Sequence, residues 1–293
     1  GIHSRQGNHQ SALEWCTAGL ETARRESGQI EVAHGTYLLG TIHWHLGHID
    51  AMVACSKRSL DLYESLGDLA GQAKTLHNLG IACTESGAWR AALKHFRHAI
   101  DLENRMGDVH AVAKTTNSLG VLMLHRGETS AAAKAYRRCL DIWKGIGFPI
   151  GIALAYSNLS EVYIACREWD KALDCLRRSE EILEEIESDL FLPEVYRRQA
   201  LVHLNTDDLA QAKQCVDRSL ALADDLDMTM EEGISLRVSG RIHRLRGDWE
   251  PAQRALGRSL EILHKQGNQY QTAETLYQMG QLYLDMARAD QED

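Results

Sequence analysis

The sequence has few residues that interrupt helices and no segment that could cross a membrane. Only 3 of the 293 residues are proline, so long helices can keep their backbone hydrogen bonds. No uninterrupted apolar run approaches the ~18 residues that a membrane-spanning helix needs, and no secretory signal peptide is visible. We therefore expect a soluble, cytoplasmic, helix-rich chain that does not insert into membranes.

Patterns that would indicate a disulfide framework or a metal site are also missing. The 7 cysteines are odd in number and contain no C-x-x-C pair, so we expect reduced thiols with structural roles. The 14 histidines include close pairs such as His95 and His98. No cysteine or carboxylate at suitable spacing completes a ligand set for such a pair. The sequence predicts no metal ion and no cofactor.

Clustered basic charge is scarce, and the motifs of common catalytic sites do not occur. The formal net charge is −9, whereas a nucleic-acid binder needs clustered Lys and Arg to neutralise phosphates. The sequence has neither a glycine-rich phosphate loop nor a nucleophile elbow. We therefore expect no nucleic-acid partner, no catalytic residues and no enzymatic activity.

What the chain does contain is a 40-residue period without insertion or deletion. One column of small residues consists of Gly40, Gly80, Gly120, Ser160, Ala200, Gly240 and Gly280. A second column consists of Ala12, Met52, Ala92, Ala132, Ala172, Ala212 and Ala252. A third, which we expect to mark turns, consists of Gly7, Gly47, Gly87, Gly127, Arg167, Asp207 and Gly247. A fixed period of this length predicts stacked structural repeats.

Each repeat reads as two antiparallel helices, which we name A and B in chain order. Residues 71–86 and 88–106 each carry apolar residues at helical spacing, and Gly87 between them can end the first helix in a left-handed conformation. Gly67-Asp68, Gly107-Asp108 and Gly267-Asn268 separate repeats, with Asp or Asn placed to cap the next helix. Because their residues are small, the first two columns predict close crossings between A and B helices.

The period divides the chain into a single array of about 14 helices. We expect a half repeat at 1–28, full repeats at about 29–67, 68–107, 108–147, 148–188, 189–227 and 228–267, and a half repeat at 268–293. Both ends are open half repeats, and the chain begins with Gly1 rather than Met. We therefore expect a piece of a longer protein, because complete arrays usually carry polar capping helices.

The repeat resembles the tetratricopeptide repeat. The resemblance is carried by Leu79-Gly80, Gly87, Trp89, Ala92, Phe96 and Ala99, and by their equivalents in the other repeats. The usual unit has about 34 residues; the longer period is similar to kinesin light chains, spindle-orientation adaptors and bacterial regulators of the maltose-activator class. The resemblance implies an all-α, right-handed superhelical solenoid whose A helices line a concave groove that binds proteins or peptides.

Columns that the resemblance places in the groove do not repeat, as expected of a surface shaped by a partner. Their sharpest feature is a group of four arginines: Arg197, Arg237, Arg241 and Arg244. The last three share one helix face, being four and then three residues apart. Arginine can donate two hydrogen bonds to a carboxylate or phosphate, which predicts an acidic ligand group. Alternatively, the arginines pair with nearby carboxylates: Glu161, Glu194 or Glu232.

A second patch of the predicted groove is polar and less sharply defined. It comprises Lys74, His77, Lys114, Asn117 and His125. This patch resembles the clamp with which some tetratricopeptide modules hold the C-terminal carboxylate of a peptide. Trp44 begins an apolar strip between the polar positions, which suits an extended or helical peptide with apolar anchors. Alternatively, neighbouring A helices bury part of this strip.

Three functions follow from these observations. The first is a protein- or peptide-binding scaffold or regulatory module that uses the A-helix groove. The second is a small-ligand sensor arm that controls a fused enzymatic or DNA-binding domain. The third is self-assembly through the open end helices. The groove columns favour the first, because exposed positions that vary between repeats indicate recognition rather than packing.

Overall fold

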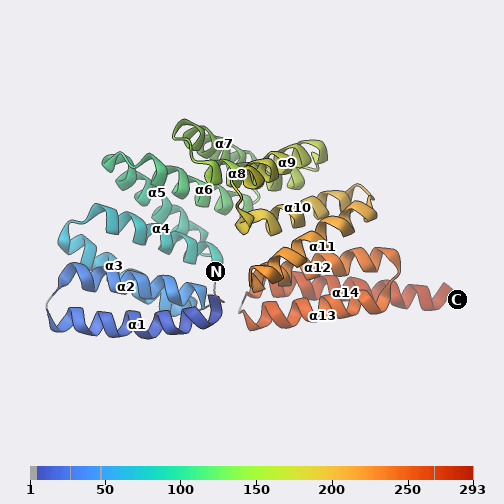
Figure 1. Cartoon of the computed structure of the whole chain (residues 1–293), viewed down its shortest axis with the longest axis horizontal. Coiled ribbons are helices and arrows are strands. Elements are labelled where there is room, and N and C mark those ends of the chain that lie inside the picture. The colour runs from blue at the N-terminus through green and yellow to red at the C-terminus, as the bar shows by residue number, and fades with distance from the viewer. Residues whose placement is uncertain (1–4, 27, 47, 267, 293) are drawn as a thin grey trace. The chain divides into compact units, whose positions relative to one another are not determined.

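The computed structural model describes residues 5–26, 28–46, 48–266 and 268–292. In these ranges fourteen α-helices and one short 3-10 helix follow one another without a strand (Figure 1). None of the helices in the described ranges is long and apolar enough to cross a membrane. The predicted all-α fold is therefore confirmed.

A and B helices alternate along the chain. The A helices are α2 (Gln29–His45), α4 (Leu69–Glu85), α6 (Val109–His125), α8 (Pro149–Ala165), α10 (Leu192–Asn205), α12 (Thr229–Arg246) and α14 (Gln269–Glu292). The B helices are α1 (Arg5–Arg25), α3 (Ile49–Leu66), α5 (Trp89–Met106), α7 (Thr129–Gly145), α9 (Trp169–Glu185), α11 (Leu209–Asp225) and α13 (Trp249–Lys265). The 3-10 helix η1 (Asp189–Phe191) precedes α10.

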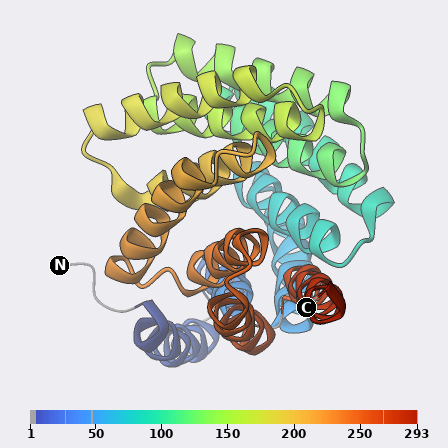
Figure 2. The same cartoon turned by 90° about the vertical axis from the view of Figure 1, so that its right-hand side faces the viewer.

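The chain divides into two compact halves, Gly1–Asn158 and Leu159–Asp293. Within each half, consecutive helices pack against one another, and the helices of a repeat form the closest pairs, such as α4 with α5 and α12 with α13 (Figures 1 and 2). The A helices of these pairs therefore bury one side against their B helices. A second side faces the neighbouring A helices, as for α10, α12 and α14.

In the described ranges, each turn with a left-handed residue lies 20 residues from the next such turn. Glycine occupies the first five positions and the last: Gly67, Gly87, Gly107, Gly127, Gly147 and Gly247. The four positions between them hold Arg167, Glu187, Asp207 and Asp227, with φ from 50° to 60°. The turn geometry is thus kept where the glycine is lost, although a side chain makes a left-handed residue less favourable.

The predicted turn column is wrong at its first position. Gly7 lies inside α1, because this helix already begins at Arg5. Gly47 and Gly267, which we also expected at turns, lie outside the described residues. At the remaining positions of the column the turns are confirmed, including those of Arg167 and Asp207.

Short polar side chains cap several A helices as predicted. Asp68 Oδ1 accepts a hydrogen bond from the Gly71 amide at 3.0 Å, and Asp108 Oδ1 accepts one from the Ala111 amide at 2.9 Å. Asn268 caps α14 in the same way: its Oδ1 accepts a hydrogen bond from the Gln271 amide at 3.0 Å. These caps satisfy amides that no preceding carbonyl can reach.

The small columns mark close helix crossings in most repeats. A Cβ atom added at Gly120 would lie 2.5 Å from the Tyr136 ring, and one at Gly240 would lie 2.6 Å from Leu256. Gly280 is different, since a Cβ atom added there would have no neighbour within 4 Å among the described residues. The predicted close crossing is therefore confirmed for the inner repeats, whereas α14 carries the glycine without a neighbouring helix on that side.

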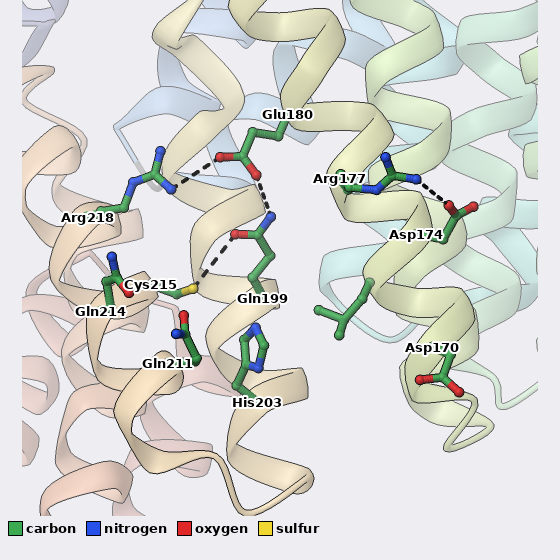
Figure 3. Close-up of a pocket in the computed structure, with 11 residues that line it drawn as sticks. Asp170, Asp174, Arg177, Glu180, Gln199, His203, Gln211, Gln214, Cys215 and Arg218 are labelled. Atoms are coloured by element: carbon green, nitrogen blue, oxygen red, sulfur yellow. Dashed lines mark hydrogen bonds and ion pairs between the residues drawn. The ribbon is translucent and has the colours of Figure 1, made fainter.

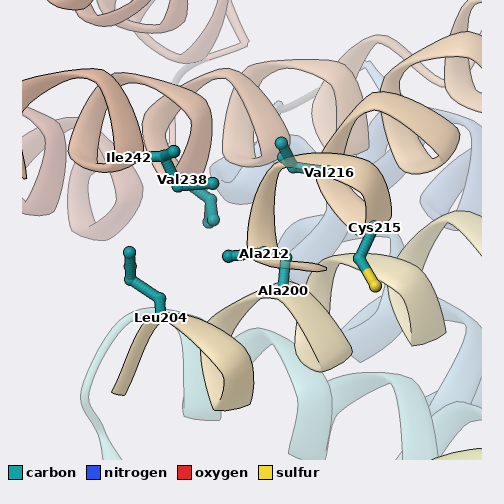
Figure 4. Close-up of a cluster of buried hydrophobic side chains, with 7 residues drawn as sticks. All are labelled: Ala200, Leu204, Ala212, Cys215, Val216, Val238 and Ile242. Atoms are coloured by element: carbon teal, nitrogen blue, oxygen red, sulfur yellow. The ribbon is translucent and has the colours of Figure 1, made fainter. Parts of the chain in front are cut away.

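The core repeats with the same period. In the C-terminal half, α10, α11 and α12 bury one apolar cluster: Ala200, Leu204, Ala212, Cys215, Val216, Val238 and Ile242 (Figure 4). The 7 cysteines, all within the described ranges, form no disulfide bond. Burial raises the pKa of Cys139 to about 12 and that of Cys215 to about 11, so both stay protonated and unreactive. The structural role predicted for these thiols fits their burial.

Candidate ligand-binding site

Three A helices of the C-terminal half carry the predicted arginine group and its contacts. Arg197 lies on α10, and Arg237, Arg241 and Arg244 lie on α12. Arg197 contacts Glu231 of α12, and Arg237 donates a hydrogen bond to the Gln271 carbonyl of α14 at 3.1 Å. The arginines therefore lie on one surface formed by α10, α12 and α14, which we call the A-helix face.

On α10, Arg197 is paired with carboxylates. Its Nε donates to Glu231, and its Nη2 lies 3.9 Å from Glu194. The side chain is only 11% exposed. Burial acts to lower the pKa of Arg197, but the charges of Glu231 and Glu194 outweigh burial and raise it. Arg197 is therefore a structural cation that joins α10 to α12.

The neighbouring arginine, Arg198, is also paired with carboxylates, although its buried Nε is unsatisfied. Its Nη2 lies 2.8 Å from Glu194 and 3.0 Å from Glu161. Glu232, the other carboxylate that we expected as a partner, instead binds Arg258 at 3.0 Å. Pairing with acidic residues is thus confirmed for the arginines of α10, with Glu231 in the place expected for Glu232.

Arg244 is paired too, at the other end of α12. Its Nη1 forms an ion pair with Asp285 of α14, and its side chain is 14% exposed. This contact fixes α12 against α14 in the same way that Arg197 fixes α10 against α12. Two of the four predicted ligand-binding arginines therefore have acidic partners within the protein.

The remaining two arginines form no ion pair within the described ranges, although the charge of Glu274 acts on both. Arg237 donates to the Gln271 carbonyl at 3.1 Å and to Thr275 Oγ1 at 3.5 Å. Arg241 makes no hydrogen bond or ion pair with any described residue, and its buried Nε is unsatisfied. Both cations lie on the A-helix face, one turn apart on α12.

Their electrostatics agree with this lack of acidic partners. Burial, followed by the charge of Arg197, lowers the pKa of Arg237 to about 10. Burial and the charge of Arg244 also lower the pKa of Arg241. The charge of Glu274 acts to raise both pKa values, but it does not offset burial and the neighbouring arginines. An anion placed between them would stabilise the charged forms.

Large exposed side chains lie on α14, the helix that Arg237 contacts. On α14, Tyr270 is 66% exposed, Tyr277 is 62% exposed and Leu284 is 53% exposed. Tyr277 and Leu284 occupy groove columns of the repeat, in register with Arg237 and Arg244. Both columns vary between repeats, and this variation is visible in the sequence. The A-helix face combines unpaired positive charge with aromatic and aliphatic surface.

The second predicted patch is divided by the structure. His77 is buried: its Nδ1 lies 3.1 Å from Thr115 Oγ1 and its ring packs edge-on against Phe96. Burial, followed by the charge of Lys114, lowers the pKa of His77 to about 3. This corrects the expectation that the His77 ring faces a ligand, because the helix turns it into the space between α4 and its neighbours.

The other members of that patch differ in how accessible their side chains are to a ligand. Asn117 accepts a hydrogen bond from Asn158 Nδ2 at 2.8 Å, so its carbonyl is already used. Lys74 and Lys114 are exposed at equivalent positions of α4 and α6, and His125 is exposed at the end of α6. Trp44 of α2 is 38% exposed. The N-terminal half therefore offers exposed lysines and an aromatic ring, but no closed clamp among its described residues.

Comparison with known proteins identifies the repeat. Residues 31–105 and 155–185 match the tetratricopeptide repeat family, whereas no curated protein sequence gives a significant match. A Rap protein in complex with Competence and Sporulation Factor has 17% identity over 90% of this chain and 72% of its own, with a TM-score of 0.73. Apo NprR, a quorum sensor from B. thuringiensis, has 12% identity over 97% and 86%, with a TM-score of 0.63.

A third solved structure is BtubC (BKLC) from P. vanneervenii. It shares 18% identity over 73% of this chain and 90% of its own, with a TM-score of 0.60. Identities at this level compare folds rather than functions. Together these matches confirm the resemblance and the helical solenoid fold that the 40-residue period predicts.

Proposed function

We propose that this chain, a solenoid of tetratricopeptide repeats, is a protein- or peptide-binding module whose A-helix face anchors an acidic group of its ligand. The observation that carries the proposal is the pair of Arg237 and Arg241. Both are largely buried cations that form no ion pair among the described residues, beside the exposed rings of α14. Structural cations in this fold have acidic partners, as Arg197 and Arg244 do.

The chemistry of the ligand follows from these two groups. A guanidinium binds a carboxylate with two parallel hydrogen bonds, which are stronger than those between neutral groups. The unsatisfied Nε of Arg241 is one of the donors available for such a bond. An aspartate, glutamate or C-terminal carboxylate of a peptide would therefore sit between Arg237 and Arg241, with an apolar residue against Tyr277 or Leu284.

The paired arginines have a supporting role in this proposal. Arg197 and Arg244 hold α10 and α14 against α12 through Glu231 and Asp285. The binding group is thus reduced from four arginines to two. A Rap protein of the same fold binds Competence and Sporulation Factor, which supports a regulatory binding role for a solenoid of this kind.

A titration with labelled peptides tests the proposal. Random peptides that contain one aspartate or glutamate beside a leucine or phenylalanine are compared with versions carrying asparagine or glutamine. We expect acidic peptides to bind and Arg237→Gln/Arg241→Gln to weaken binding by about tenfold or more, as for lost hydrogen bonds to charged groups. Arg258→Gln, which removes an exposed pair with Glu232, is the matched control. Equal affinity of the double variant and the control variant would contradict the proposal.

A second candidate function, self-association through α14, rests on a separate observation. Leu276 is 52% exposed and Tyr283 is 47% exposed. Gly280 lies between them in the sequence, and a Cβ atom added there would have no neighbour within 4 Å among the described residues. In the preceding A helix the equivalent glycine, Gly240, packs against Leu256 of a B helix. Sedimentation velocity over a concentration series tests this candidate. A concentration-independent monomer, unchanged by Leu276→Lys, would exclude it.

A further inference from the structure

Two core columns of the repeat lose their apolar residues at the same place. One column holds Leu20, Leu60, Ile100, Leu140, Leu220 and Leu260, but Glu180 in the remaining repeat. The other holds Leu39, Leu79, Leu119, Leu159 and Met279, with the small Ser239 and, at the same repeat boundary, Gln199. Core positions hold similar residues in every repeat because each repeat packs against its neighbours in the same way. Two polar replacements that meet in space therefore need a local reason.

Glu180 and Gln199 contact each other directly. Gln199 Nε2 donates to Glu180 Oε2 at 2.7 Å, and Arg218 Nη1 lies 3.2 Å from Glu180 Oε1 (Figure 3). The Arg218 guanidinium lies 3.9 Å from the centroid of the Tyr196 ring. The network is satisfied internally, so its polar groups are stable where leucine side chains would otherwise close the space.

That space is a cleft between the B helices α9 and α11, with α10 as its floor. Its volume is about 500 Å³, within the range of small-ligand sites. Besides the network, it is lined by Asp170 of α9, His203 of α10, and Gln211 and Gln214 of α11 (Figure 3). None of these four side chains has a hydrogen-bond or ionic partner within the described ranges, so all four are available to a ligand.

The charges around the cleft select a cation. Arg177 is paired with Asp174 at 2.9 Å and with Glu181 at 3.0 Å, and Arg218 is paired with Glu180. Asp170 alone among the charged lining residues has no ionic partner in the described part of the chain. An anion would find both guanidiniums occupied, whereas a cation with several N–H donors would find a carboxylate, two amide carbonyls and an imidazole.

We propose that the cleft between α9 and α11 binds a guanidinium or primary ammonium group. Asp170 provides the charge, and His203, Gln211 and Gln214 accept hydrogen bonds. The group can belong to a free amine or to an arginine or lysine side chain of a partner. This site lies between B helices and uses none of the residues of the A-helix face. It is therefore independent of the proposed function.

Calorimetric titration with Nα-acetyl-arginine amide, called arginine amide below, tests the charge requirement. Nα-acetyl-citrulline amide is the matched probe, because it has nearly the same shape as the arginine probe and carries no positive charge. We expect arginine amide to bind at least about tenfold more tightly, in line with a charged hydrogen bond. Equal binding of the two probes, or no binding of arginine amide at millimolar concentration, would overturn the proposal.

Variants of the cleft locate the binding site. Asp170→Asn should weaken arginine amide binding by about tenfold, while Asp217→Asn should leave it unchanged. Asp217 is on α11, the other B helix of the cleft, but it pairs with Lys213 at 2.6 Å and does not line the cleft. Because Asp170 is exposed, its substitution is not expected to affect folding. Parent-like binding by Asp170→Asn would contradict the assignment.

A second variant restores the repeat pattern. Glu180→Leu/Gln199→Leu returns both columns to leucine, which should fill the cleft and abolish arginine amide binding. Circular dichroism verifies that the variant is folded. If the variant does not fold, the binding measurement on Asp170→Asn tests the proposal instead. A folded double variant that still binds arginine amide would overturn the proposal. Peptides containing one arginine then distinguish the two sources: tighter binding than arginine amide indicates a partner side chain, and weaker binding indicates a free amine.

Discussion

Glu103 is a buried carboxyl group in a core column that otherwise holds no charged residue. Its equivalents are Tyr63, Trp143, Leu183, Ala223 and Leu263. Glu103 is 3% exposed; its Oε1 accepts from Thr115 Oγ1 at 2.7 Å, and its Oε2 is unsatisfied. Burial raises the pKa of Glu103 above its ordinary value. The ionised group therefore destabilises the native state.

This environment predicts that Glu103→Gln increases stability at neutral pH. Because the folded-state pKa is raised, the native state binds more protons than the unfolded state just above the ordinary pKa, so stability falls as pH rises there. Glutamine keeps an acceptor for Thr115 and removes the charge, which should add about 1–3 kcal/mol to the free energy of unfolding at pH 7. Urea denaturation at pH 4 and pH 7 measures this, with the exposed Asp101→Asn as control. A variant less stable than the parent at pH 7 would disprove the argument.

His77 has the opposite pH dependence. Its pKa is lowered to about 3 by burial, followed by the charge of Lys114. Between pH 6.5 and 3 the unfolded state binds more protons than the native state, so this histidine makes stability fall as pH is lowered. At pH 4.5 the loss should be about 2–3 kcal/mol, at about 1.4 kcal/mol per pH unit.

The variant His77→Gln isolates that contribution. Glutamine can still bond to Thr115 but does not titrate, so the variant should lose less stability than the parent between pH 7 and pH 4.5. Denaturation curves at both pH values give the difference, and His98→Gln, at an exposed position, is the control. Identical losses for parent and His77→Gln would show that the ring protonates in the folded protein.

At the scale of helices, the glycine column predicts how alanine substitutions change stability. Gly240 and Gly280 occupy equivalent positions of α12 and α14, but an added Cβ meets Leu256 at 2.6 Å only at Gly240. Gly240→Ala should therefore cost about 1–3 kcal/mol through overpacking. Gly280→Ala should add about 0.5–1 kcal/mol, since alanine favours helix. Thermal unfolding of the pair measures both. Equal effects of the two substitutions on stability would mean that helix propensity, and not the close helix crossing at Gly240, determines the stability change.

The period explains why the helices could be predicted from the sequence. Many helix boundaries lie at columns that hold glycine or capping residues such as Asp68 and Asp108, which act locally. Contacts between helices were less predictable. Arg197 selects Glu231 rather than Glu232 because neighbouring residues point about 100° apart on a helix, and only the packing of α12 shows which one faces α10. His77 was misplaced for the same reason.

At the scale of the whole molecule, the departures from the repeat concentrate where ligand groups are predicted. The A-helix face shows unpaired charge at Arg237 and Arg241, and the cleft shows polar residues at Glu180 and Gln199. Both lie in the C-terminal half, on different helix sides. The periodic columns could be recognised from sequence, but the pairing state of each arginine required the structure, because it depends on side-chain positions across three helices.

The separation of these two sites predicts that their ligands bind independently. Each ligand at about 100 times its Kd should stabilise the native state by about 2.7 kcal/mol. Because the sites share no residue, the two stabilisations should add, and the Kd of an acidic peptide should change less than about twofold when arginine amide saturates the cleft. Calorimetric titration of the peptide with and without arginine amide measures this, and Asp170→Asn is the control. A larger change in Kd, absent in that variant, would show that α10 and α11 couple the cleft to the A-helix face.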